Sequence, residues 1–81
     1  MDIGGISGAA RLLDVARLAR VWEPLVERDV PAHAVAVRFG YGTMRLLNAH
    51  ARRLTGVSTH DLGDHYTRQT FGNKLADALI S

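Results

Sequence analysis

Cysteine is absent from this chain, and so are long hydrophobic runs. Without cysteine there is no disulfide framework, no thiolate nucleophile and no zinc site of the cysteine-rich kinds. No apolar run approaches the roughly 20 residues that span a bilayer, and the N-terminus opens with Met1-Asp2 rather than with a basic signal region. We therefore expect a soluble, unprocessed protein that has no membrane partner, with the cytoplasm as the default compartment.

A chain of 81 residues has room for one small domain. Domains cluster at about 100–150 residues, and a chain of this size buries only about 60% of the surface that its unfolded form exposes. The hydrophobic fraction of 47% and the charged fraction of 22% are typical of a chain that folds. Because the core is small, we expect further burial against a partner or a second copy.

The formal net charge of +2 is unevenly distributed along the chain. Arginines and acids cancel over residues 1–40, whereas residues 41–57 contain Arg45, Arg52 and Arg53 and no acid. Nine of the ten basic residues are arginine, whose forked guanidinium binds phosphate and guanine edges in a geometry that lysine cannot copy. Codon bias accounts equally well for the preference for arginine, but it does not explain the clustering.

Hydrophobic periodicity and helix-ending residues predict an all-α fold, a small bundle of four to five helices. Residues 1–7 are glycine-rich and are expected to form a flexible leader, followed by a single helical domain over residues 8–81. An amphipathic helix is predicted from residue 8 to residue 22, and Pro24 and Pro31 each suit the first turn of a further helix. The apolar face predicted for the first helix consists of Leu12, Val15, Ala19 and Trp22.

Residues 31–39 fit two kinds of secondary structure. Val35, Val37 and Phe39 alternate as in a strand, whereas the alanines between them favour a helix. We favour the helix, because a lone strand has no obvious partner elsewhere in the chain. Gly40-Tyr41-Gly42 is then a tight connection to the next helix.

The clearest helix is predicted from Thr43 to the glycine at position 56, with two arginines in its final turn. Ser58 and Asp61 form a capping-box-like start for a C-terminal helical segment over residues 58–81. Its last part is expected to be a short amphipathic helix beyond Gly72.

Residues 25–47 are similar to the helix-turn-helix of resolvase, transposase and repressor DNA-binding domains. In that family the first helix carries a small residue, a glycine follows four positions later, and a hydrophobic residue enters the core six positions after the glycine. Ala36, Gly40 and Leu46 occupy these places. The small residue allows close helix crossing, and the glycine gives the turn its backbone freedom. The resemblance implies a helix-turn-helix over about residues 31–55, with its second helix as the recognition helix.

The helix after the turn has two contrasting faces. Arg45, Asn48 and Arg52 lie on one face, with Thr43 at its N-terminal end, and arginine and asparagine read guanine and adenine in the major groove. The opposite stripe consists of Met44, Leu47, Ala51 and Leu54. This stripe is the cleaner core face, whereas the resemblance places Leu46 in the core, so two registers are open for this helix.

We predict a small helix-turn-helix DNA-binding protein, a transcriptional or recombination regulator that acts on double-stranded DNA as a homodimer or higher homo-oligomer. The expected base contacts are Thr43, Arg45 and Asn48. The expected phosphate contacts are Arg38, Arg52, Arg53 and Arg68. Pairing is expected because one small module buries little surface and two half-sites multiply its affinity. The alternative is a helical self-assembling structural or adaptor protein, a subunit of a virion, nucleoid or other complex, without sequence-specific DNA binding.

Two further segments carry residue types that occur in catalytic and metal sites. His60 and His65 are five residues apart, which turns their rings about 140° away from each other on a helix and is poor for a shared metal. His65 and Arg68 are similar to the His-x-x-Arg box of tyrosine recombinases over residues 65–76, which implies contact with a scissile phosphate. No tyrosine follows Phe71 to act as the nucleophile. We therefore expect no catalytic residues, no metal and no cofactor.

Overall fold

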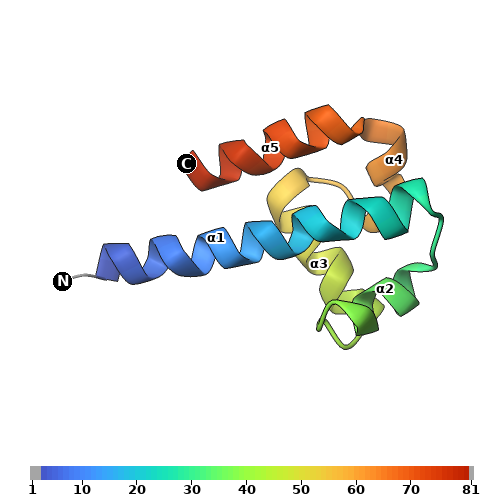
Figure 1. The fold of residues 1–81 in the computed structure, drawn as a ribbon, viewed down its shortest axis with the longest axis horizontal. Helices are drawn as coiled ribbons and strands as arrows, with labels where there is room; N and C mark the ends of the chain where they lie inside the picture. The colour runs from blue at the N-terminus through green and yellow to red at the C-terminus, as the bar shows by residue number, and fades with distance from the viewer. Residues whose placement is uncertain (1–2, 81) are drawn as a thin grey trace.

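The computed structural model describes the backbone of residues 3–80 and the side chains from Arg11 onward. Within this range the chain forms five α-helices and no strand, which confirms the predicted all-α fold. The helices are α1 (Ile3–Trp22), α2 (Ala32–Arg38), α3 (Met44–Thr55), α4 (Leu62–His65) and α5 (Arg68–Ile80), as Figure 1 shows. A π-helical segment, η1 (Glu23–Glu27), continues α1, and a 3-10 turn, η2 (Thr59–Asp61), precedes α4.

The two longest helices, α1 and α5, lie side by side and run in opposite directions (Figure 1). Helix α3 crosses this pair and contacts both members, while α2 packs against α3. The core lies where the three helices α1, α3 and α5 meet, and most of its buried residues are aliphatic or aromatic. No helix within residues 3–80 is both long and apolar enough to cross a membrane.

Helix α1 begins earlier than its glycine content predicts. It starts at Ile3, so the leader expected over residues 1–7 is wrong for residues 3–7, and residues 1–2 lie outside the described part of the chain. The helix continues without a break into η1, where Pro24 occupies the first turn, as expected for a residue that lacks a backbone N–H.

The buried face of α1 differs from the predicted one. Leu18 and Val21 are fully buried, whereas Leu12 is 54% exposed. Ala19 is also exposed, so the predicted stripe is correct only at its other two positions, Val15 and Trp22. Trp22 stacks on Phe71 of α5 with ring centroids 4.8 Å apart, and this contact joins the two long helices.

Residues 34–38 are helical, so the strand alternative for this segment is wrong. Ala36 is fully buried, as a small residue at a close helix crossing should be. After α2 the chain turns through Gly40 and Gly42, which both have φ +83°, a conformation that glycine adopts without steric cost. The residue between them, Tyr41, is buried in the core.

Helix α3 begins and ends as the sequence predicts. The Thr43 hydroxyl accepts a hydrogen bond from the backbone N–H of Leu46 at 3.2 Å, and Gly56 ends the helix in the left-handed conformation at φ +86°. Leu47 is fully buried, whereas Leu46 is 55% exposed. Of the two registers left open by the sequence, the one that buries Leu47 is confirmed, and the core position expected for Leu46 from the family resemblance is wrong.

Helix α5 also begins earlier than expected, at Arg68 rather than beyond Gly72. Its start is capped by Thr67 and Thr70: the N–H of Thr70 donates to the hydroxyl oxygen of Thr67 at 3.1 Å, and the N–H of Thr67 donates to the hydroxyl oxygen of Thr70 at 2.7 Å. This reciprocal pair satisfies backbone donors that a helix start leaves free. Because the helix begins there, Gly72 lies within α5 rather than before it.

Candidate nucleic-acid interface

An exposed line of residues runs along α3, opposite its buried face. Arg45, Ala49 and Arg52 are all exposed, and their spacing of four and three residues keeps them within about 60° around the helix axis. We call these three residues the α3 ridge. The ridge arginines form no ion pair within the described part of the chain. Because the opposite side of α3 is packed in the core, the ridge has a fixed orientation.

Asn48, a predicted base contact, lies at the edge of this exposed face and is half-buried. Its side-chain oxygen accepts hydrogen bonds from the backbone N–H of Thr59, at 3.0 Å, and from the Thr59 hydroxyl. The side chain therefore joins α3 to η2. Reading an adenine with both amide atoms would require Asn48 to give up these bonds.

The remaining predicted DNA contacts are distributed over different parts of the molecule. Thr43 lies at the exposed start of α3, where its hydroxyl caps the helix. Arg38 is exposed at the end of α2, and Arg53 is exposed on α3, where it forms an ion pair with Asp14 of α1 at 3.3 Å. Arg68 is not brought near them, because it pairs at 3.1 Å with Glu27 of η1.

A buried polar pair lies beneath the turn and α3. The Tyr41 hydroxyl and His50 Nδ1 are 2.7 Å apart, and the Arg17 guanidinium lies 5.2 Å from the centre of the Tyr41 ring. Burial raises the pKa of Tyr41 to about 12. Burial also lowers the pKa of His50; nearby Asp14 opposes this shift, while Arg53 adds to it. Both groups are therefore neutral near pH 7, and the pair fixes the turn against α3.

Two adjoining grooves separate α1 from α2 and α3. The larger has a volume of about 540 Å³ and contains three arginines, Arg17, Arg20 and Arg38, with Leu13, Ala16, Phe39 and Gly40 as its other lining residues. We call it the arginine groove. The smaller, of about 290 Å³, shares Arg17 and Gly40 with it and reaches Ala49 of the α3 ridge.

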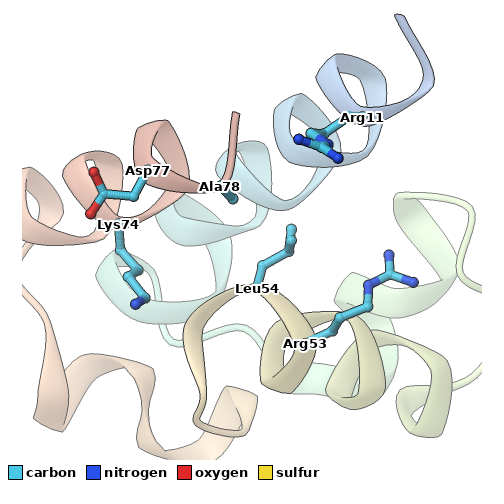
Figure 2. A pocket seen from close by; sticks show the side chains of 6 residues that line it. All are labelled: Arg11, Arg53, Leu54, Lys74, Asp77 and Ala78. Atoms are coloured by element: carbon cyan, nitrogen blue, oxygen red, sulfur yellow. The ribbon is translucent and has the colours of Figure 1, made fainter. Parts of the chain in front are cut away.

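A third groove lies at the other end of α3, between α1 and α5. Figure 2 shows Arg11 of α1, Arg53 of α3 and Lys74 of α5 around it, three cationic side chains from three helices. Leu54, Asp77 and Ala78 complete the lining of this groove, which has a volume of about 420 Å³. Arg53 borders both this groove and the 290 Å³ groove, so cationic side chains continue around α3.

The acidic residues are concentrated elsewhere. Five of the seven acids in the described residues lie in residues 23–29 and 61–68, where η1 runs beside η2 and α4 (Figure 1); they are Glu23, Glu27, Asp29, Asp61 and Asp64. We call these two segments the acidic end. Arg28 and Arg68 are its only basic residues. The other eight basic residues belong to α1, α2, α3 and α5, which carry two described acids, Asp14 and Asp77.

The His-x-x-Arg segment is divided between two helices. His65 is the last residue of α4, and Arg68 is the first residue of α5. Within residues 3–80, no group of three or more histidines and acids is arranged to hold a metal ion.

Two residues of this surface were not predicted from the sequence, Arg17 and Arg20. Their three-residue spacing on α1 was the only sign of a shared face. These two arginines meet Arg38 because α2 packs beside α1, and the sequence pattern does not encode that packing.

Comparisons with models of protein families, with curated proteins and with solved structures give no match to this chain.

Proposed function

We propose that this chain is a helix-turn-helix protein that binds double-stranded DNA, with α2, the glycine turn and α3 as the motif. The observation that carries the proposal is the α3 ridge, in which two exposed arginines flank a small residue on a helix that is buried on its other side. A single α-helix fits the major groove, which is about 12 Å wide. The small Ala49 lets the helix approach the base edges closely.

In this proposal Arg45 reads base edges from the first turns of α3, with Thr43 beside it at the helix start. Arg38, Arg52 and Arg53 contact phosphates. Asn48 contributes to base reading only if it exchanges its bonds with Thr59 for bonds to a base. Arg68 is left out of the proposed interface, because it lies at the acidic end and pairs with Glu27.

We propose further that two copies act together, as a transcriptional or recombination regulator on paired half-sites. The exposed apolar side chains outside the grooves beside α3 give a surface for such pairing; they include Leu12, Val37, Leu79 and Ile80, which are 54%, 68%, 39% and 84% exposed. The same side chains favour a second candidate function, self-assembly as a structural subunit that does not bind DNA.

The test is fluorescence anisotropy of a labelled mixed-sequence duplex at 50 mM salt, with wild type and two matched double variants. Arg45→Ala/Arg52→Ala removes the ridge arginines, and we expect affinity to decrease at least about tenfold. Arg28→Ala/Arg68→Ala removes the same charge from the acidic end, and we expect a change below about twofold, because neither residue is in the proposed interface.

Equal losses in the two variants would show that only the net charge matters and would contradict a role for α3. Absence of wild-type binding at this salt concentration would contradict DNA binding altogether. Sedimentation of the wild type without DNA then decides the second candidate, which requires stable oligomers.

A further inference from the structure

We infer that the arginine groove is a second contact surface, which holds the sugar–phosphate backbone of the duplex beside the segment that α3 enters. The inference rests on the proposed function, since it takes duplex DNA as the ligand. It adds Arg17 and Arg20 of α1 to the interface and assigns them to one flanking strand.

The chemistry of the groove fits a polyanion. Arg17 and Arg20 lie on one side of α1, three residues apart, and Arg38 ends α2 across from them. No acidic side chain of the described residues lines this groove. Three like charges that share a groove repel one another, and a row of phosphates removes that repulsion through charge-assisted hydrogen bonds. The apolar lining of Leu13 and Phe39 suits the carbon face of deoxyribose.

The groove is also in the right place. The smaller groove shares Arg17 with it and is lined as well by Leu46 and Ala49, so the surface continues from the α3 ridge to the arginine groove. A duplex that receives α3 in its major groove has one strand on each side of the helix. The strand on the α1 side meets the arginine groove.

The other side of α3 has the opposite character. There Asn48 binds Thr59 of η2, and the adjoining groove is lined by Asp29 and His60 without an arginine or lysine. An anionic strand gains nothing on that side. The structure therefore predicts asymmetric backbone contacts, strong on the α1 side and weak on the η2 side.

One arginine of the groove is held in place by the core. The Arg17 guanidinium lies over the ring of Tyr41, and the Tyr41 hydroxyl is fixed by His50. Arg20 and Arg38 are exposed and make no ion pair within the described residues. These two arginines are therefore the ones to change, since their removal leaves the packing of α1 against the turn intact.

The experiment measures duplex affinity by anisotropy at several salt concentrations between 50 and 200 mM for wild type, Arg20→Gln/Arg38→Gln and Arg28→Gln/Arg68→Gln. Each phosphate contact contributes about 0.9 to the slope of log affinity against log salt. In the groove variant, Arg20→Gln/Arg38→Gln, this slope should be smaller by about 1.8 than in wild type. Its loss of affinity relative to wild type is then about 12-fold larger at 50 mM than at 200 mM salt. The control variant, with the same net charge, should keep the wild-type slope.

The outcomes separate the two proposals. If the wild type binds and the slope falls by only about 0.9, the loss is that of the Arg38 contact in the proposed function, and this inference is overturned. An unchanged slope overturns the inference too and removes Arg38 from the interface, while binding through α3 stands. If the wild type does not bind, the proposed function fails first. Thermal unfolding by circular dichroism verifies that both variants are folded.

Another possible occupant of the groove is the acidic end of a second copy. In that case the wild type would form salt-sensitive oligomers without DNA, and both Arg20→Gln/Arg38→Gln and Glu23→Gln/Asp29→Asn would abolish these oligomers. The slope of log DNA affinity against log salt would be the same in Arg20→Gln/Arg38→Gln as in wild type. This result also overturns the inference.

Discussion

The arginine-bearing helices and the acidic end carry an excess of charges of opposite sign. Apart from Arg68 at the start of α5, which belongs to the acidic end, helices α1, α2, α3 and α5 carry eight basic residues and two described acids. The acidic end carries two basic residues and five acids. The net charge of +2 conceals this separation. A chain with a small net charge therefore has grooves lined by cationic side chains and a separate acidic end.

The separation acts before any contact is made. A polyanion that approaches the molecule is attracted to one region and repelled by the other, so the molecule is oriented during the encounter. Electrostatic steering of this kind depends on salt and increases the rate of association more than it slows dissociation. Similar side chains therefore have different surroundings: Arg68 at the acidic end pairs with Glu27, whereas Arg45 and Arg52 of the ridge form no ion pair within the described residues.

The largest expected effect comes from removing what holds the cationic region in shape. Leu47 of α3 is fully buried, so Leu47→Ala should lower the free energy of unfolding by about 2–5 kcal/mol through lost burial and a residual cavity. The matched variant Leu46→Ala should change it by less than about 0.5 kcal/mol, because Leu46 is exposed. Urea unfolding followed by circular dichroism measures both. A larger cost for Leu46→Ala would mean that the other face of α3 packs in the core and that the ridge is misassigned.

A smaller effect is expected on acidification, and it distinguishes the histidines of the two regions. The pKa of His50 is lowered below 6.5 in the folded state, so below about pH 6.5 the unfolded state binds more protons than the folded state. The contribution of His50 to stability is therefore complete above this pH and is lost as the pH falls below it. His60, in η2 directly before the acidic end, is exposed.

The measurement is the melting temperature at pH 7.5 and at pH 5.5. The decrease in melting temperature from pH 7.5 to pH 5.5 should be smaller in His50→Gln than in wild type. In His60→Gln this decrease should be the same as in wild type. The reverse pattern would place the acid-sensitive group at the acidic end rather than beneath α3.

The smallest expected effects come from the two surface ion pairs, one in each region. Arg53→Ala breaks a pair at 3.3 Å with Asp14, and Arg68→Ala breaks a pair at 3.1 Å with Glu27. All four side chains are well exposed, so each variant should lose no more than about 1 kcal/mol of stability in urea unfolding. Duplex affinity should fall only for Arg53→Ala. Equal affinity losses would remove the functional distinction between the two regions.

Local signals in the sequence were sufficient where one helix face is strongly apolar. For α3, the cap at Thr43, the end at Gly56 and the burial of Leu47 all follow from pattern and turn chemistry. The same reasoning failed for α1, which has apolar side chains on several sides: Leu12 and Leu18 are equally hydrophobic, yet only Leu18 is buried. Which of them is buried depends on where α5 and α3 cross α1, and periodicity does not contain that information.

The candidate site shows the same limit. The exposure of Arg45 and Arg52 follows from the helical period of α3. The bonds between Asn48 and Thr59 join residues 11 positions apart, and the meeting of Arg20 with Arg38 joins two different helices. Such contacts arise from tertiary packing, so the sequence pattern indicates neither that Asn48 is bonded to Thr59 nor that arginines of α1 and α2 share a groove.

The two glycines on either side of Tyr41 have a further consequence, for how this scaffold can change. A Cβ atom at Gly40 or Gly42 would meet nothing within 4 Å, so backbone conformation rather than space requires glycine there. With Tyr41 buried between them, the angle between α2 and α3 is set by three residues that do not belong to the ridge. Residues 45, 49 and 52 are thus free to vary while the support stays constant. In the proposed function, a new DNA preference can evolve, or be engineered, by exchanging the ridge alone.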